Sequence, residues 1–105
     1  MKFVMTNTTT RKPTWKLVGA NGEMVAWAGE SFYDQSGSLR AARAFKVGAL
    51  TARYEVYADA SGQYRWRAWR GSDKVAASGE AFASKSNAER AAENVRLNAG
   101  SATGV

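Results

Sequence analysis

The sequence states nearly the same pattern twice, and this duplication limits what the chain can fold into. Trp15 falls on Trp66 at a spacing of 51 residues, and after a one-residue slip Phe32 falls on Phe82 at a spacing of 50. Because a segment of about 50 residues buries too little surface to be stable alone, we expect both copies to share one core. We predict one pseudo-two-fold domain over residues 1–105, with repeat one at 2–49, repeat two at 53–99 and a flexible tail or short closing strand at 100–105.

Each repeat has the pattern of three strands followed by a helix. In repeat two, alternating residues at 54–58 and 64–69 flank the turn Asp59–Gly62, and a short third strand follows near 75–77. Repeat one carries an Asn21–Gly22 hairpin turn and a helix around Ser38–Lys46. We expect the second helix to start with a capping box at Ser86–Glu89 and to end at Gly100. The predicted fold class is α+β, with one antiparallel sheet and two helices on one face.

The composition favours anionic partners and argues against disulfides, metal sites and histidine-based catalysis. Fifteen Lys and Arg against nine Asp and Glu give a net charge of +6, which favours anionic partners, nucleic acid first, although a small basic domain is also simply well solvated. The chain has no cysteine and no histidine, which removes disulfides and the commonest metal ligands and general base. No Gly-rich phosphate loop is present. We therefore expect no cofactor and no metal.

The sequence predicts neither a membrane span nor a signal peptide. No apolar run approaches the roughly 20 residues of a membrane helix, and the first residues turn polar too soon for a signal peptide. We expect a cytoplasmic protein with no membrane partner. We also expect a monomeric pseudo-dimer and not an obligate oligomer.

Without histidine and cysteine, the remaining candidates for catalytic chemistry are serine with lysine, or paired carboxylates. Glu30 and Glu80 occupy equivalent positions after glycines, and a two-fold axis between the repeats would bring them together. The alternative is that both are solvated turn residues. Because no further catalytic constellation is visible, we expect the protein not to be an enzyme.

Three segments carry a resemblance to a known family. Gly62–Arg67, Ala20–Glu23 and the Ser-rich segment that leads into Ala88–Ala99 resemble the YegP-like family, small proteins of unknown function that often contain two copies of the motif. Repeat one departs from the pattern at Lys12–Thr14, and repeat two departs from it at Ser72–Asp73. The resemblance implies β-β-β-α units with a short closing strand, joined in one sheet and exchanging their final strands. It implies no catalytic residues.

The sheet face opposite the helices is the best candidate for a binding surface. If Trp15 and Trp66 point toward the helices, intervening residues point away, and the Asn21–Gly22 turn places Trp27 opposite Lys16. The candidate residues are Lys16, Trp27, Tyr57, Arg65, Arg67 and Trp69.

Three interpretations of this basic, aromatic face remain open. The cations and rings pack on one another, or the face binds a protein or a second copy, or it stacks the bases of single-stranded nucleic acid. The function that we predict is a small non-enzymatic binding module for single-stranded nucleic acid. The alternative is a protein–protein interaction or self-association module that uses the same face.

Overall fold

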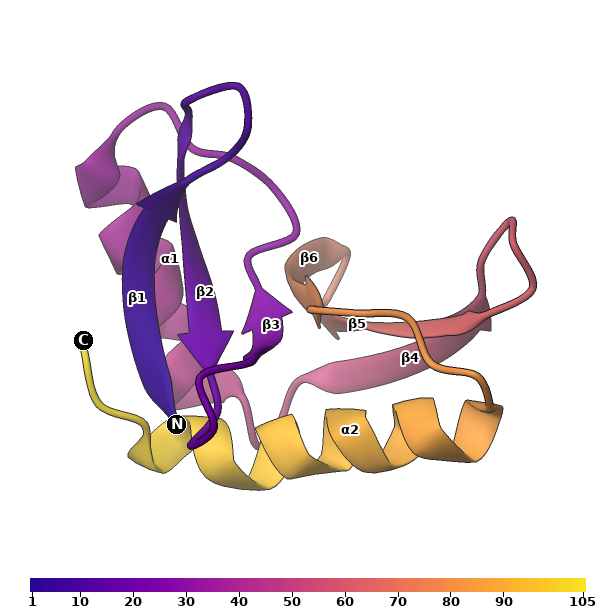
Figure 1. The fold of residues 1–105 in the computed structure, drawn as a ribbon. Helices are drawn as coiled ribbons and strands as arrows, with labels where there is room; N and C mark the ends of the chain where they lie inside the picture. Colours follow the sequence, from indigo (N-terminus) through magenta and orange to yellow (C-terminus); the bar gives the residue numbers. More distant parts are fainter.

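The computed structural model describes residues 1–105 and contains six strands, two α-helices and one short 3-10 helix (Figure 1). Neither α-helix is long and apolar enough to span a membrane. In chain order the elements are β1 (Lys2–Asn7), β2 (Pro13–Val18), β3 (Met24–Trp27), α1 (Gln35–Gly48), β4 (Arg53–Ala58), β5 (Tyr64–Arg70), β6 (Asp73–Ser78), α2 (Lys85–Asn98) and η1 (Ala99–Ser101).

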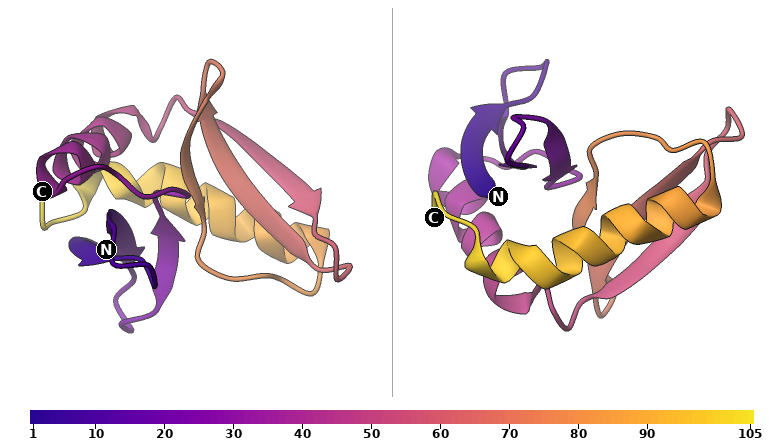
Figure 2. Two further views of the ribbon diagram at one scale, coloured as in Figure 1. Left: turned by 90° about the horizontal axis from the view of Figure 1, so that it is seen from above. Right: turned by 60° about the horizontal axis from the view of Figure 1, so that its bottom comes forward.

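The six strands form one antiparallel sheet in the order β1-β2-β3-β6-β5-β4. Two three-stranded halves meet where β3 pairs with β6 through Ala26–Ser78 and Trp27–Ala77, and Figure 2 shows the halves inclined to each other. Gly79 lies directly against the backbone of Met24, where a Cβ would overlap the carbonyl oxygen. Glycine at this position therefore allows the two halves to join. The predicted α+β class is confirmed.

The core lies between the sheet and the two helices. Helix α1 packs on β1 and β2, and α2 packs on β4 and β5. Trp15 and Trp66 are both fully buried, and the Trp15 ring stacks on Phe45 with centroids 5.4 Å apart. Aromatic pairs of this kind add stability beyond the area that they bury. The two tryptophans thus define the inner face of the sheet, and the other face is called the outer face below.

Both helices begin earlier than the sequence pattern predicts. Ser84 has extended backbone angles and its hydroxyl accepts a hydrogen bond from the amide of Asn87, so Ser84 is the N-cap of α2. The predicted Ser86–Glu89 capping box is therefore wrong, because Ser86 already lies in the first helical turn. Helix α1 likewise begins after Asp34, whose carboxylate accepts from the amide of Gly37 at 2.8 Å.

The end of the chain lies against the first strand. After α2 the chain makes the η1 turn, so Gly100 lies inside η1 and the helix itself ends at Asn98. Thr103 then pairs in parallel with β1: its carbonyl accepts from the amide of Phe3 at 2.8 Å, and its amide donates to Met1 at 3.1 Å. Ala102 is buried. The last residues therefore act as a closing strand on the half of the sheet that contains β1. The resemblance to the YegP-like family implied such an exchanged closing strand for this repeat.

Candidate binding surface on the outer sheet face

The register of the sheet places one row of side chains across all six strands of the outer face. Lys16 lies opposite Trp27, as the Asn21–Gly22 turn predicted. Trp27 pairs with Ala77, which pairs with Arg67 on its other side. Because side chains alternate between the faces of a sheet, these residues share the face opposite Trp15 and Trp66. From edge to edge the row is Val4, Lys16, Trp27, Ala77, Arg67 and Glu55.

Arg67 is held by its neighbours on β4 and β5. Its Nε donates to the Glu55 carboxylate at 2.6 Å, and the Trp69 indole N–H donates to the same oxygen at 3.1 Å. The guanidinium carbon lies 4.3 Å from the Tyr57 ring centroid and 5.4 Å from that of Trp69. The hydrogen bonds from Arg67 and then Trp69 hold the pKa of Glu55 below its usual range. Glu55, Tyr57, Arg67 and Trp69 therefore already use their charges, rings and hydrogen-bonding groups on one another. They are called the Arg67 cluster below.

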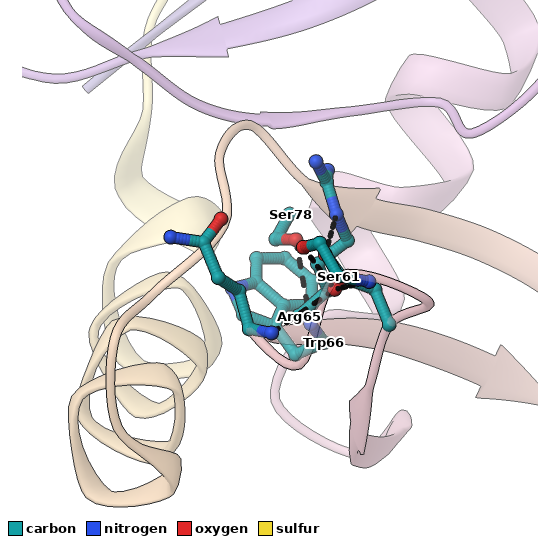
Figure 3. Close-up of polar contacts among 6 residues, drawn as sticks. Ser61, Arg65, Trp66 and Ser78 are labelled. Atoms are coloured by element: carbon teal, nitrogen blue, oxygen red, sulfur yellow. Dashed lines mark hydrogen bonds and ion pairs between the residues drawn. The ribbon is translucent and has the colours of Figure 1, made fainter.

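Arg65 is neutralised in a similar way by the turn that precedes its strand. Its Nε donates to Asp59 at 3.1 Å, and the hydroxyl and amide of Ser61 donate to the other carboxylate oxygen at 2.7 and 2.9 Å (Figure 3). The Ser61 hydroxyl is the main cause of the lowered pKa of Asp59. At the next residue of β5, the amide of Trp66 donates to the Ser78 hydroxyl at 3.3 Å. Arg65 therefore also has a fixed partner.

Lys16 and Trp27 differ from these arginines, because neither side chain has a hydrogen bond, an ion pair or an aromatic partner within the chain. Both line a groove of about 380 Å³ beside the β1–β2 hairpin. The rest of its wall comes from Thr6, Asn7, Thr8, Thr9, Thr14, Trp15 and Met24, and most of the exposed lining is apolar. This is called the Trp27 groove below.

The six predicted residues thus share one face but fall into two groups. Lys16 and Trp27 line an open groove, whereas Tyr57, Arg65, Arg67 and Trp69 already have partners within the chain. The sequence analysis missed the carboxylates of Glu55 and Asp59 and the threonines of the groove. A signal for Glu55 was available: counting back through the predicted Asp59–Gly62 turn places it opposite Arg67.

The hypothesis of a Glu30–Glu80 carboxylate pair is wrong. Strands β3 and β6 run antiparallel with Trp27 opposite Ala77, and each glutamate follows the end of its own strand. The two carboxylates therefore leave the junction in opposite directions. No group of three or more Asp, Glu, His or Cys residues is placed to hold a metal ion.

Comparison with known proteins places the chain in a family. A family described as a domain of unknown function (DUF1508) matches residues 59–105. A UPF0339 protein of Neisseria meningitidis serogroup B is 40% identical over 40 residues, which cover 38% of this chain and 71% of the relative. A second meningococcal UPF0339 protein, from serogroup A, matches equally well. The chain belongs to the UPF0339 family, small proteins to which no activity is assigned.

Two solved structures share the fold of the whole chain. A UPF0339 protein of Shewanella oneidensis superposes with a TM-score of 0.80 at 13% identity, covering 98% of this chain and 88% of the other. The E. coli protein yegP, of unknown function, superposes with a TM-score of 0.80 at 16% identity, covering 97% and 88%. At these identities the likeness concerns the fold alone. It agrees with the resemblance to YegP-like proteins seen in the sequence.

Proposed function

We propose that this protein is a non-enzymatic binding module that holds single-stranded nucleic acid on its outer face, with a base stacked on Trp27. The observation that carries the proposal is the Trp27 groove. An indole without an aromatic partner stands beside an open groove of about 380 Å³ and next to a lysine without a carboxylate. Trp27 is half-buried, and the apolar surface that lines the groove beside it is of the kind that marks a contact site.

The groove offers the two interactions that single-strand binding needs. The ring of Trp27 provides a surface for stacking, which every base accepts, and Lys16 provides a charge for a phosphate. The hydroxyls of Thr6 and Thr9 and the amide of Asn7 supply hydrogen-bonding groups for base edges or sugars. A net charge of +6 favours the approach of any polyanion.

The Arg67 cluster supports the alternative function, a protein–protein or self-association module on the same face. Trp, Tyr and Arg are the residues that dominate interface hot spots, and here Arg67 is already ordered between Tyr57 and Trp69. Ordering before binding reduces the entropy that association costs. In this alternative the mass of the protein in sedimentation rises with concentration, or a protein partner masks Trp69.

The test is fluorescence anisotropy of a labelled oligo-dT, titrated with the protein at low and near-physiological salt. Trp27→Ala is expected to weaken binding roughly tenfold, since stacking of one base is worth about 1–3 kcal/mol, and to leave the salt slope unchanged. Lys16→Ala is expected to weaken binding and reduce the salt slope by about one.

The matched control is Tyr33→Ala, because Tyr33 is a fully exposed aromatic residue in the loop before α1. This variant is expected to bind like the unmodified protein. If Trp27→Ala and Lys16→Ala also bind like the unmodified protein, the Trp27 groove is not the binding site and the proposal fails. Concentration-dependent mass that is lost in Trp69→Ala would favour the self-association alternative.

A further inference from the structure

The carboxyl-terminal ends of α1 and α2 meet on the helix side of the molecule, away from the outer face (Figure 2). Five large hydrophobic side chains of this protein are exposed, and three of them lie here: Val47 at 87%, Leu50 at 58% and Leu97 at 58%. They line, with Lys46 and Arg96, a groove of about 370 Å³. Val47, Leu50 and Leu97 are called the helix-end patch below.

The surroundings of the helix-end patch are positively charged. Lys46 and Arg96 lie in the groove itself, and Arg43 lies one helical turn before Val47. Arg70 reaches over from β5 and donates to the carbonyl of Ala44 at 2.9 Å. Helix α1 contains no acidic residue at all. The carboxylate nearest in the sequence is Glu93, which is already bound to Arg96.

These charges decide between the kinds of occupant that an aliphatic groove accepts. A second copy of the chain would bring the same cations against Arg43 and Arg70, which is unfavourable. Nucleic acid gains little from Val47 and Leu97, because aliphatic side chains offer no ring for base stacking. A partner with aliphatic side chains and carboxylates complements both properties, since its apolar groups fill the groove while its charges meet the cationic rim.

We propose that the helix-end patch docks an acidic, amphipathic helical segment of a partner protein. Leu, Ile or Val side chains of that segment lie in the groove between the two helix ends, against Leu50 and Leu97. Its Asp and Glu side chains face Arg43 and Arg70, whereas Lys46 already donates to the carbonyl of Val105 at 3.2 Å. This contact uses none of the residues of the Trp27 groove, so the two proposals stand or fall separately.

The test uses the full chain and a labelled amphipathic peptide with Leu along one helical face and Glu on the remainder. The comparison peptide has Lys in place of every Glu. Anisotropy titrations are expected to show that the Glu peptide binds at least roughly tenfold more tightly than the Lys peptide. The double variant Leu50→Ser with Leu97→Ser is expected to weaken binding of the Glu peptide at least roughly tenfold, because it removes the aliphatic contacts.

Two control variants locate the binding. Tyr33→Ser changes a fully exposed apolar residue outside the helix-end patch, and Trp27→Ala changes the outer face. Both are expected to bind the Glu peptide normally. The leucines of the patch are themselves exposed, and circular dichroism verifies that the double variant is folded.

The proposal is overturned if the Glu peptide fails to bind, if the Lys peptide binds equally well, or if the double variant binds as tightly as the unmodified protein. A parallel experiment uses vesicles of phosphatidylcholine with phosphatidylglycerol. Vesicle binding that needs Leu50 and Leu97, in the absence of peptide binding, would replace the protein partner with an anionic membrane surface and would also overturn the proposal.

Discussion

At the scale of single residues, the position of carboxylates decides which basic residues of the outer face remain available. Arg67 has Glu55 at 2.6 Å and Arg65 has Asp59 at 3.1 Å, whereas Lys16 has no acidic partner. Ion pairs at this degree of exposure contribute little to the stability of the fold. They matter here mainly because they cancel charge that a phosphate would otherwise meet.

Replacing Glu55 tests this account directly. Glu55→Gln keeps the size of the side chain but removes a negative charge from the outer face and releases the charge of Arg67. We expect tighter binding of oligo-dT and a salt slope that is steeper by about one counter-ion. The control is Glu93→Gln, which removes a paired carboxylate from α2. Equal or weaker binding by Glu55→Gln would mean that phosphates do not approach this cluster.

Tyr54 gives the protein a specific response to alkaline pH. Its hydroxyl donates to the carbonyl of Ala49 at 2.8 Å, and burial raises its pKa to about 12. An unfolded tyrosine ionises near pH 10, so between about pH 10 and 12 the folded protein holds more protons than the unfolded chain. The stability that this provides is complete below about pH 10 and is lost as the pH rises through 12.

Urea unfolding at several pH values measures this effect. The unmodified protein is expected to lose stability more steeply than Tyr54→Phe between about pH 10 and 12. At neutral pH the variant is expected to be less stable by about 1 kcal/mol, because the Ala49 carbonyl loses a hydrogen bond. Parallel pH profiles for the two proteins would show that Tyr54 does not titrate as the structure implies.

At the scale of elements, turn chemistry in the sequence located two hairpins. The Asp59–Gly62 turn lies in a hairpin of regular register, and Gly22 and Gly62 both have positive φ. The two-residue type I′ turn predicted at Asn21–Gly22 is wrong, because Asn21 does not have positive φ and the register shifts between Leu17 and Val18. The predicted opposition of Lys16 and Trp27 is observed, with a bulge between Leu17 and Val18 separating this pair from the turn. Helix starts were predicted less well, because several serines and an aspartate compete for the cap position within a few residues.

Tertiary structure resolves this competition for α2. Phe82 forms two backbone hydrogen bonds with Tyr64, at 2.7 and 2.8 Å, and these fix the chain two residues before Ser84. Ser84 is then the first polar residue that can accept from the amides of the first turn. A sequence pattern contains no information about this bridge, since Tyr64 lies on another strand.

The two serines provide a matched pair of variants. Ser84→Ala is expected to destabilise the protein by about 1 kcal/mol, because the Asn87 amide loses its acceptor. Ser86→Ala is expected to change stability by less than about 0.5 kcal/mol, since an exposed position inside the first turn tolerates alanine. Chemical denaturation measures both values. The reverse order would restore Ser86 as the cap.

At the scale of the whole molecule, the sequence pattern did not predict how the two halves of the sheet contact each other. The pattern indicated one shared sheet, but the pairing of β3 with β6 is non-local and depends on the close approach of Gly79 to Met24. The error over Glu30 and Glu80 has the same origin, because only the register of this junction shows that the two carboxylates point apart.

Contacts across the whole sheet divide the predicted binding site on the outer face into an open groove and a set of residues that already have partners. The alternation of strand residues placed all six candidates on the outer face, and the structure shows them there. Alternation does not show which cations already have partners or where the surface is hollow. Those properties depend on contacts between strands and on the shape of the β1–β2 hairpin, and they leave the Trp27 groove as the open part of the face.

The central claim, that Trp27 stacks on a base, is tested most directly by the indole N–H signals in a ¹⁵N correlation spectrum. The four tryptophans report separate places: Trp15 and Trp66 are fully buried, Trp69 is bound to Glu55, and Trp27 lies at the groove. On addition of oligo-dT, the account predicts a large shift of the Trp27 signal that salt suppresses, with the Trp66 signal unchanged, because Trp66 lies outside the groove that Trp15 and Trp27 line. If the Trp27 signal stays in place while the oligonucleotide is bound, the claim is contradicted.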